Sequence, residues 1–323
     1  MRDLLSIADL DRDDIDRVCA RARSFAEVGR REIKKVPTLR GKTVVSLFYE
    51  SSTRTSSSFE LAAKRLSADV VSIKAAGSSV DKGESLRDTI ATLTAYGPEA
   101  IVIRSPHAGA ASLVSGWTDA AVVNAGDGKH EHPSQALLDV YTLTERVGPL
   151  DGKEIWIVGD VAHSRVARSC IRAFATMGAR VTVAGPPTLL PRGIEHLGCA
   201  VRHDIDDIAE ADVVYALRMQ NERMSTSYLP SLREYASEFQ INSRRLTPRQ
   251  LVMHPGPVNR DVELSAEVID GPSSLIVEQV AAGLLVRMAI LYEILAGGER
   301  PRTLAAIEDP AGRDLPGPIG EPA

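Results

Sequence analysis

The sequence predicts an α/β protein of two domains, each a doubly wound, mostly parallel sheet flanked by helices. Short apolar runs rich in β-branched residues alternate with helical patterns along most of the 323 residues. This alternation is typical of parallel strands joined by helices. A break at 148–152, Gly-Pro-Leu-Asp-Gly, separates two such series. The chain is long enough to give each series a core of its own.

The composition is that of an ordinary folded protein without a strong charge bias. Hydrophobic residues make up 44% and charged residues 25%, and the net charge is -5, which argues against a general nucleic-acid or anionic-membrane binder. No stretch is apolar enough to span a membrane, and the N-terminus lacks a signal-peptide pattern. The cysteines, Cys19, Cys170 and Cys199, show no metal-binding spacing and suit a reducing compartment. We therefore expect a cytoplasmic protein without nucleic-acid or membrane partners.

The first series extends to about residue 147. An amphipathic helix is predicted over 6–23, with Asp9 or Asp11 near its start. Strands are predicted at 43–49, 69–74, 100–104 and 121–124. Helices are predicted over 58–66, from 84 onward, and after 130–135 up to about 147, and a loop of small residues occupies 75–83.

Polar side chains stand where these strands end. They are Ser52, Thr53, Arg54 and Thr55 after the first strand, Arg104 at the third, and His132 and Gln135 after the fourth. Hydroxyls and a guanidinium at a helix N-terminus suit a phosphate, although 51–55 alone would be read as an ordinary N-cap with a solvated arginine. Because ligands bind at the carboxyl ends of parallel strands, the convergence of these side chains predicts an anion site.

The second series repeats this design. Strands are predicted at 154–158, 180–184, 200–203, 212–217 and 251–254. The turn at 159–165 lacks the G-x-G-x-x-G pattern, which argues against a dinucleotide site, and carries an arginine, Arg165, instead. Arg218 and Gln220 follow the fourth of these strands. A nearly apolar helix over 275–295 completes the pattern and is predicted to be buried.

Several motifs resemble those of the aspartate carbamoyltransferase family. The run 48–55, Phe-Tyr-Glu-Ser-Ser-Thr-Arg-Thr, is similar to the carbamoyl-phosphate signature of all transcarbamoylases. The segments 124–135, 218–223 and 254–257 resemble the aspartate branch more narrowly. The resemblance extends roughly from residue 4 to residue 295, with the motifs in the order and spacing of the family.

The resemblance implies a division of the chain into four parts. They are a carbamoyl-phosphate-binding domain (1–147), an aspartate-binding domain (148–273), a C-terminal helix that returns to the first domain (274–296), and a tail (297–323). The tail is rich in Pro, Gly and acidic residues, a composition that predicts disorder.

The resemblance implies carbamoyl transfer from carbamoyl phosphate to the amine of L-aspartate in pyrimidine biosynthesis, with no cofactor and no metal. The implied phosphate ligands are Ser52, Thr53, Arg54 and Thr55. The carbamoyl oxygen would face Thr55, Arg104 and His132, and the carbamoyl amide would face Gln135 and the carbonyl groups of Pro255 and Gly256. The carboxylates of aspartate would be held by Arg165, Arg218 and Gln220. Chemistry of this kind depends mainly on positioning and electrostatic stabilisation.

The resemblance also implies a homotrimer whose active sites are shared between subunits. The loop 75–83 would carry Ser79 and Lys82 into the site of a neighbouring subunit, whereas alone it would be read as a flexible surface loop. Glu50 would pair with Arg165 and Arg223 when the domains close, whereas alone it would be read as a strand-end residue. The sequence does not identify regulatory or dihydroorotase chains as partners.

Two positions depart from the family pattern and keep alternatives open. Ser56 stands where the family usually has a second arginine, and Ser105 where it often has a histidine. The alternatives are a carbamoyltransferase acting on another amine and a non-catalytic partner with the transcarbamoylase fold. Arg165, Arg218 and Gln220 are retained, which favours a dicarboxylic acceptor. The phosphate and carbonyl ligands are retained as well, which argues against a non-catalytic chain. An ornithine enzyme is disfavoured because 254–257 reads His-Pro-Gly-Pro in place of H-C-L-P.

Overall fold

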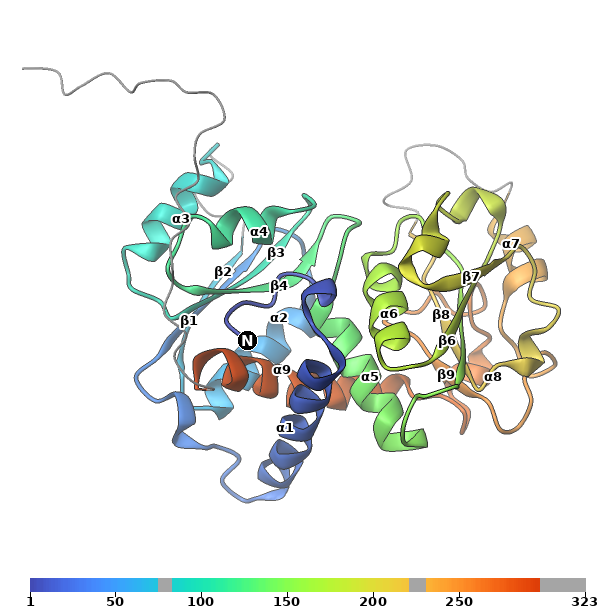
Figure 1. The fold of residues 1–323 in the computed structure, drawn as a ribbon, viewed down its shortest axis with the longest axis horizontal. Helices are drawn as coiled ribbons and strands as arrows, with labels where there is room; N and C mark the ends of the chain where they lie inside the picture. Colours follow the sequence, from blue (N-terminus) through green and yellow to red (C-terminus); the bar gives the residue numbers. More distant parts are fainter. Residues whose placement is uncertain (75–82, 221–230, 297–323) are drawn as a thin grey trace, which may run out of the picture.

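The structure is a computed structural model that describes residues 1–74, 83–220 and 231–296, and this part of the chain forms two parallel sheets (Figure 1). The strand order is β2-β1-β3-β4 in the first sheet and β7-β6-β5-β8-β9 in the second. Neighbouring strands are parallel throughout both sheets. The predicted fold class is confirmed. Residues 75–82 of the loop predicted at 75–83, and the predicted tail, lie outside the described residues.

The strands lie close to their predicted positions. The first sheet consists of β1 (Thr43–Phe48), β2 (Asp69–Lys74), β3 (Ala100–Ser105) and β4 (Ala121–Asp127). The second consists of β5 (Glu154–Val158), β6 (Arg180–Ala184), β7 (Cys199–Arg202), β8 (Val213–Ala216) and β9 (Leu251–Met253). Strands β1, β3, β4 and β8 are buried at nearly every position, because helices cover both faces of such sheets.

The helices alternate with the strands. The first sheet is accompanied by α1 (Arg12–Arg30), α2 (Thr53–Arg65), α3 (Leu86–Thr94), α4 (Ala110–Ser115) and α5 (Pro133–Val147). The second is accompanied by α6 (Arg165–Thr176), α7 (Leu232–Phe239) and α8 (Ala266–Ile269), and α9 (Ile276–Leu295) follows. Short 3-10 turns lie at Ile7–Asp9, Pro37–Leu39, Pro187–Leu189, Ile194–Leu197 and Ile208–Glu210. The short helices α4, α7 and α8 were not predicted.

The predicted helix over 6–23 is wrong at both ends. Ser6 caps only a 3-10 turn, Ile7–Asp9, and a second cap at Asp11 starts α1. Asp11 and Asp14 form a reciprocal capping box, which satisfies the free backbone N–H groups at the start of a helix. In a helix continuous from residue 6 these N–H groups would be paired within the helix and would need no cap. The helix then continues to Arg30 because buried apolar positions extend beyond residue 23.

Each sheet has a point where the winding of the chain reverses. In the first sheet this point lies between β1 and β3, and in the second between β5 and β8. Tyr49 N donates to Arg104 O at 2.9 Å, and Leu217 N donates to Val158 O at 2.8 Å. The segments that follow each pair of strands therefore start side by side. Ser52–Thr55 follow β1, and Arg165 and Arg218 follow β5 and β8, whereas Arg104 lies near the end of β3.

Helix α9 returns to the first sheet, as predicted. It packs against α1, α2 and α5 (Figure 1), and Lys42 Nζ donates to the carbonyl oxygen of Leu295 at 2.8 Å. Helix α5 is buried from Pro133 to Leu143 and packs on both α9 and α6. One apolar core thus continues from the first sheet into the second through α5. No helix among the described residues is long and apolar enough to cross a membrane.

Candidate active site

The N-terminus of α2 presents hydroxyls and a guanidinium beside the reversal point of the first sheet. Ser52 is the N-cap residue, and its side chain makes no capping hydrogen bond. Thr53 and Arg54 are exposed, whereas Thr55 is buried in the first turn. Partial burial, followed by the proximity of Arg218, lowers the pKa of Arg54. We call Ser52–Thr55 the α2 rim. Its composition and helix dipole suit a phosphate.

A carboxylate, Glu50, links arginines from both halves of the chain. Its Oε2 lies 2.5 Å from Nη2 of Arg165 and 3.4 Å from Nε of Arg104. Burial lowers the pKa of Arg104 to about 10, and the nearby Arg165 lowers it further, whereas Glu50 raises it. Arg165 Nη1 is buried and has no hydrogen-bond partner among the described residues. The cluster therefore carries more positive than negative charge, as an anion site requires.

Two glycines allow the second half of the chain to approach the first. At Gly126, after β4, an added Cβ would lie 3.1 Å from Cδ and Nη1 of Arg165. At Gly256, after β9, it would overlap the guanidinium of Arg54. Both glycines have a positive φ, 115° and 64°, a backbone conformation that residues with a side chain rarely adopt. The turn predicted to carry the Pro255 and Gly256 carbonyls thus lies directly against the α2 rim.

His132 is the N-cap residue of α5 and is buried. Burial lowers its pKa well below the usual value, with smaller effects of Arg104, Arg287 and Arg165. The ring is therefore neutral at physiological pH. Its Nδ1 lies 3.4 Å from Ser134 Oγ, and acceptance of that hydroxyl proton would leave the proton of the ring on Nε2. A neutral ring with such an N–H can donate to a carbonyl oxygen.

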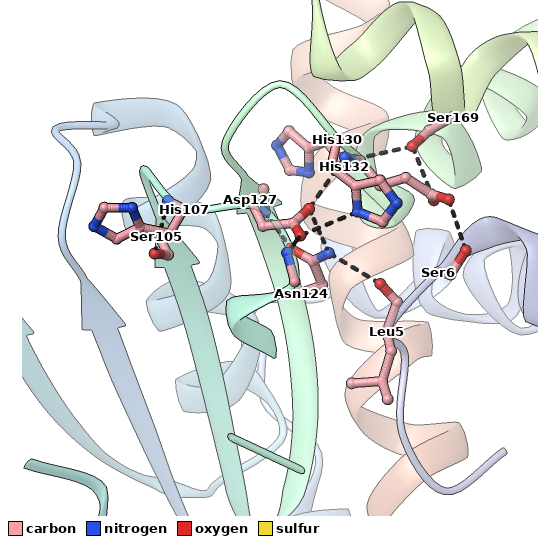
Figure 2. Close-up of polar contacts among 12 residues, drawn as sticks. Leu5, Ser6, Ser105, His107, Asn124, Asp127, His130, His132 and Ser169 are labelled. Carbon is pink, nitrogen blue, oxygen red and sulfur yellow. Dashed lines mark hydrogen bonds and ion pairs between the residues drawn. The ribbon is translucent and has the colours of Figure 1, made fainter. Parts of the chain in front are cut away.

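A network of carboxylates holds the turn from β4 to α5 (Figure 2). Asp127 accepts from Asn124 Nδ2 and from the backbone of Glu131, both at 3.0 Å, and lies 3.1 Å from His130 Nδ1. Glu131 accepts from Ser6 Oγ at 2.6 Å. It also accepts at 3.2 Å from Ser169 Oγ, which itself accepts from His132 N at 2.9 Å. This network fixes the backbone at His132. The roles of Asp127 and Glu131 were not predicted, because no local sequence pattern indicates them.

Gln135 lies in the first turn of α5, where its Nε2 donates to Asp139 Oδ1 at 3.1 Å. Gln279, on α9, donates to the same oxygen at 2.7 Å. Its Oε1 accepts from His254 N at 3.0 Å. His254 lies in the turn after β9, and its Nδ1 accepts from Gly256 N at 2.8 Å. We call Gln135, Asp139 and Gln279 the α5–α9 seam. It connects the two predicted carbamoyl-amide ligands.

The predicted acceptor-binding residues follow β5 and β8. Arg165 begins α6 and is buried, and Arg218 is close enough to Arg54 to affect its pKa. The backbone N–H of Gln220 donates to Asp160 Oδ2 at 3.3 Å. Asp160 in turn lies 2.8 Å from His163 Nδ1. Asp160 thus joins the loop after β5 to the segment after β8. Arg165 and Arg218, which lie on these two segments, face the first sheet.

Several buried charged residues near the site were not predicted. Ser79, Lys82 and Arg223 lie outside the described residues. Arg287, on α9, is buried, and its guanidinium lies 5.2 Å from the Phe59 ring centroid. Burial lowers its pKa to about 10. Asp139 stands four residues after Gln135 on one helix, and this spacing was the only local signal of the seam.

The fold and the site together define a class of protein. Two doubly wound sheets place the N-terminus of a helix, a neutral histidine and a cluster of arginines at facing strand ends. Such a site has the chemistry to hold a phosphate or a similar anion beside a second, negatively charged ligand.

The comparisons with known proteins identify the family. Residues 2–145 match the carbamoyl-P binding domain of aspartate/ornithine carbamoyltransferase, and residues 151–294 match the Asp/Orn binding domain. The chain is 51% identical over 321 residues to an aspartate carbamoyltransferase catalytic subunit of Acidothermus cellulolyticus, covering 98% of this chain and 99% of that protein. It is 55% identical over 312 residues to the corresponding subunit of Kineococcus radiotolerans, covering 92% and 98%.

A solved structure agrees with this relationship. Aspartate transcarbamoylase of Trypanosoma cruzi, in complex with carbamoyl phosphate and aspartate, is 31% identical and has a TM-score of 0.81, covering 91% of this chain and 97% of that chain. The chain therefore belongs to the aspartate/ornithine carbamoyltransferase family.

Proposed function

We propose that this chain transfers the carbamoyl group of carbamoyl phosphate to the amine of L-aspartate, giving N-carbamoyl-L-aspartate and phosphate. The observation that carries the proposal is the meeting of Arg54, Arg104 and Arg165 around Glu50 and Gly256. Relatives at more than half identity are named as aspartate carbamoyltransferase catalytic subunits. The proposed division of the chain is a carbamoyl-phosphate domain over 1–147 and an aspartate domain over 148–273.

The first proposed step is binding of the phosphate at the α2 rim. Ser52, Thr53 and Thr55 offer hydroxyls, and Arg54 offers a guanidinium that suits the phosphate oxygens. The carbonyl oxygen then receives hydrogen bonds from Thr55, Arg104 and His132. Attack by the amine moves negative charge onto this oxygen, and each preorganised donor of this kind contributes about 10²-fold or more to the rate. Collapse of the tetrahedral intermediate expels phosphate, which accepts the amine proton.

The acceptor is proposed to bind on the side of the second sheet. Arg165, Arg218 and Gln220 would hold the two carboxylates, which suits the bidentate geometry of arginine. Contact between Glu50 and Arg165, 2.5 Å in this structure, supports a role for Glu50 in domain closure. Arg223 is proposed as a second partner of Glu50. The protein is proposed to act in the cytoplasm, in pyrimidine biosynthesis.

A panel of amine acceptors tests the proposed reaction. Purified protein would be given carbamoyl phosphate with L-aspartate, L-ornithine or other amines, and the carbamoylated product measured. Rapid turnover with L-aspartate alone supports the proposal. Turnover with another amine would indicate that Ser56 and Ser105, which depart from the family pattern, belong to a site for a different acceptor. Binding of carbamoyl phosphate without turnover of any amine would favour a non-catalytic partner.

A homotrimer with shared sites is part of the proposal, with Ser79 and Lys82 supplied by the neighbouring subunit. Its test uses two inactive variants, Lys82→Ala and Arg54→Ala, dissociated and reassembled together. Mixed trimers should regain activity, because some of their sites combine an intact Arg54 with an intact Lys82. Mixed trimers that form and remain inactive would contradict shared sites.

A further inference from the structure

A fully buried carboxylate lies directly behind the proposed amide-binding residue. Asp139 is 0% exposed. Its Oδ1 accepts from Nε2 of Gln135 at 3.1 Å and of Gln279 at 2.7 Å. Its Oδ2 accepts from Tyr215 OH at 2.7 Å and lies 3.4 Å from Cys170 Sγ. A buried carboxylate is costly even when it is well hydrogen-bonded, so its use at this position calls for a reason beyond packing.

The contact with Asp139 determines which end of the Gln135 amide is free. A glutamine side chain has an NH2 group that donates and a carbonyl oxygen that accepts. Because Asp139 can only accept when ionised, it takes the NH2 group, and Oε1 of Gln135 is left as an acceptor. The amide of a carbamoyl group presents N–H donors. The free end of Gln135 therefore has the polarity that a carbamoyl amide needs and that a methyl group cannot use.

The contact with Gln279 extends this control to the second amide ligand. Gln279 donates to Oδ1 of Asp139 and accepts from His254 N, so its own orientation is fixed at both ends. His254 then accepts from Gly256 N, and its Nε2 lies 3.2 Å from the buried Glu263. The turn that carries the Pro255 and Gly256 carbonyls is thus tied through Gln279 to the same carboxylate oxygen that orients Gln135.

We propose that Asp139 and Gln279 are positioning residues that make the donor site selective for a carbamoyl amide. The proposal rests on the proposed function, since it concerns the donor of that reaction. Asp139 and Gln279 set the polarity of Gln135 and the place of the 254–257 turn without contacting the substrate. Selection arises because a donor without amide hydrogens would leave the aligned carbonyl oxygens unpaired.

Asp139 also joins the two halves of the chain through Tyr215 on β8, and this structural role provides the control. Tyr215→Phe removes a donor from Oδ2 and leaves both contacts of Oδ1 in place. Gln279→Met keeps the length of the side chain and removes its link between Asp139 and His254. Asp139→Ala removes the carboxylate altogether. A purely structural role would affect the melting temperature in all three variants and would leave donor selectivity unchanged.

The test compares carbamoyl phosphate with acetyl phosphate, which has a methyl group in place of the amino group. Dissociation constants for both compounds would be measured by calorimetry, with melting temperature as the measure of folding. We expect Gln279→Met and Asp139→Ala to reduce the preference for carbamoyl phosphate about tenfold, as loss of a hydrogen bond predicts. Tyr215→Phe should lower the melting temperature and retain the preference.

An unchanged preference in Gln279→Met, with a melting temperature showing that it is folded, would overturn the proposal even if Asp139→Ala fails to fold. An equal loss of preference in Tyr215→Phe would also overturn it, because the effect would then not depend on Oδ1. Failure of the proposed function has a different signature, since the wild-type protein would then form no N-carbamoyl-L-aspartate. The binding ratios remain measurable in that case and still decide the role of the seam.

Discussion

The α2 rim and the α5–α9 seam face the same proposed ligand and are built in opposite ways. The rim takes its hydroxyls and Arg54 from four consecutive residues at the start of one helix. The seam joins residues 140 positions apart, Asp139 and Gln279, and it is buried. The rim therefore depends on local geometry and on the helix dipole. The seam depends on the return of α9 to the first sheet, so the fold itself determines which atoms of the seam donate and which accept hydrogen bonds.

This difference predicts different kinds of failure. Changes at Thr53 and Arg54 of the rim should reduce the rate while leaving the fold intact, because these side chains are exposed. Changes in the seam should alter stability and selectivity together, because its hydrogen bonds are buried and shared with the turn after β9.

The largest expected effect is that of Arg54→Ala in the rim. We expect kcat with carbamoyl phosphate and L-aspartate to fall by about 10³-fold, the loss expected when a group that stabilises charge in the transition state is removed. The melting temperature should remain within a few degrees of wild type. A matched variant, Arg65→Ala at the far end of α2, should keep its activity. Similar losses in both variants would show that the effect comes from the helix and not from the site.

The second prediction concerns the pH dependence of stability at Asp139. Burial raises its pKa from 3.8 to about 6 in spite of its four donors. The folded protein therefore binds this proton more tightly than the unfolded chain. The contribution of this group to the free energy of unfolding is largest below about pH 4, falls through the window up to about pH 6, and is level above it. A shift of two pKa units corresponds to a change of about 3 kcal/mol in the free energy of unfolding across this window.

Denaturant unfolding of wild type and Asp139→Asn at several pH values measures this contribution. The asparagine variant should lose the part of the pH dependence that falls in this window, and Asp151→Asn, at an exposed carboxylate, serves as its control. The same slope in wild type and Asp139→Asn would mean that Asp139 titrates normally in the folded protein.

The third prediction addresses the contact between the two halves. Glu50→Ala removes the partner of Arg165 and Arg104, so closure around the substrates should become less favourable. We expect kcat to fall about tenfold and the KM for L-aspartate to rise, as for other changes that impair closure. Steady-state kinetics with each substrate varied in turn would measure both effects. Unchanged kinetics would remove Glu50 from the account of closure.

The smallest expected effect is that of Arg287→Met. Arg287 lies within the same charge cluster and affects the pKa of His132. Because it acts through space on the phosphate, we expect the dissociation constant of carbamoyl phosphate to rise several-fold at low salt and less at high salt. Arg287→Lys keeps the charge and should bind nearly as wild type. A loss that does not depend on salt would indicate repacking around Phe59 instead.

The sequence predicted the rim more completely than the seam, and for a physical reason. Ser52 to Thr55 are neighbours whose chemistry can be read directly before a helix, and strand ends brought Arg104 and His132 to the same edge. Asp139 and Gln279 look like ordinary residues of two helices until α9 is known to pack on α5. The first helix was misplaced because two caps, Ser6 and Asp11, compete within one turn. Side-chain pairs that cross the fold leave no local pattern.

The most direct test of the account compares the rates at which the wild-type protein and Arg54→Ala form N-carbamoyl-L-aspartate. Equal melting temperatures of the two proteins would show that both are folded. The account predicts rapid, enzyme-dependent product formation by the wild type and its near loss in the variant. Equal rates in the two proteins, or no product from the wild type with carbamoyl phosphate and L-aspartate both saturating, would contradict it.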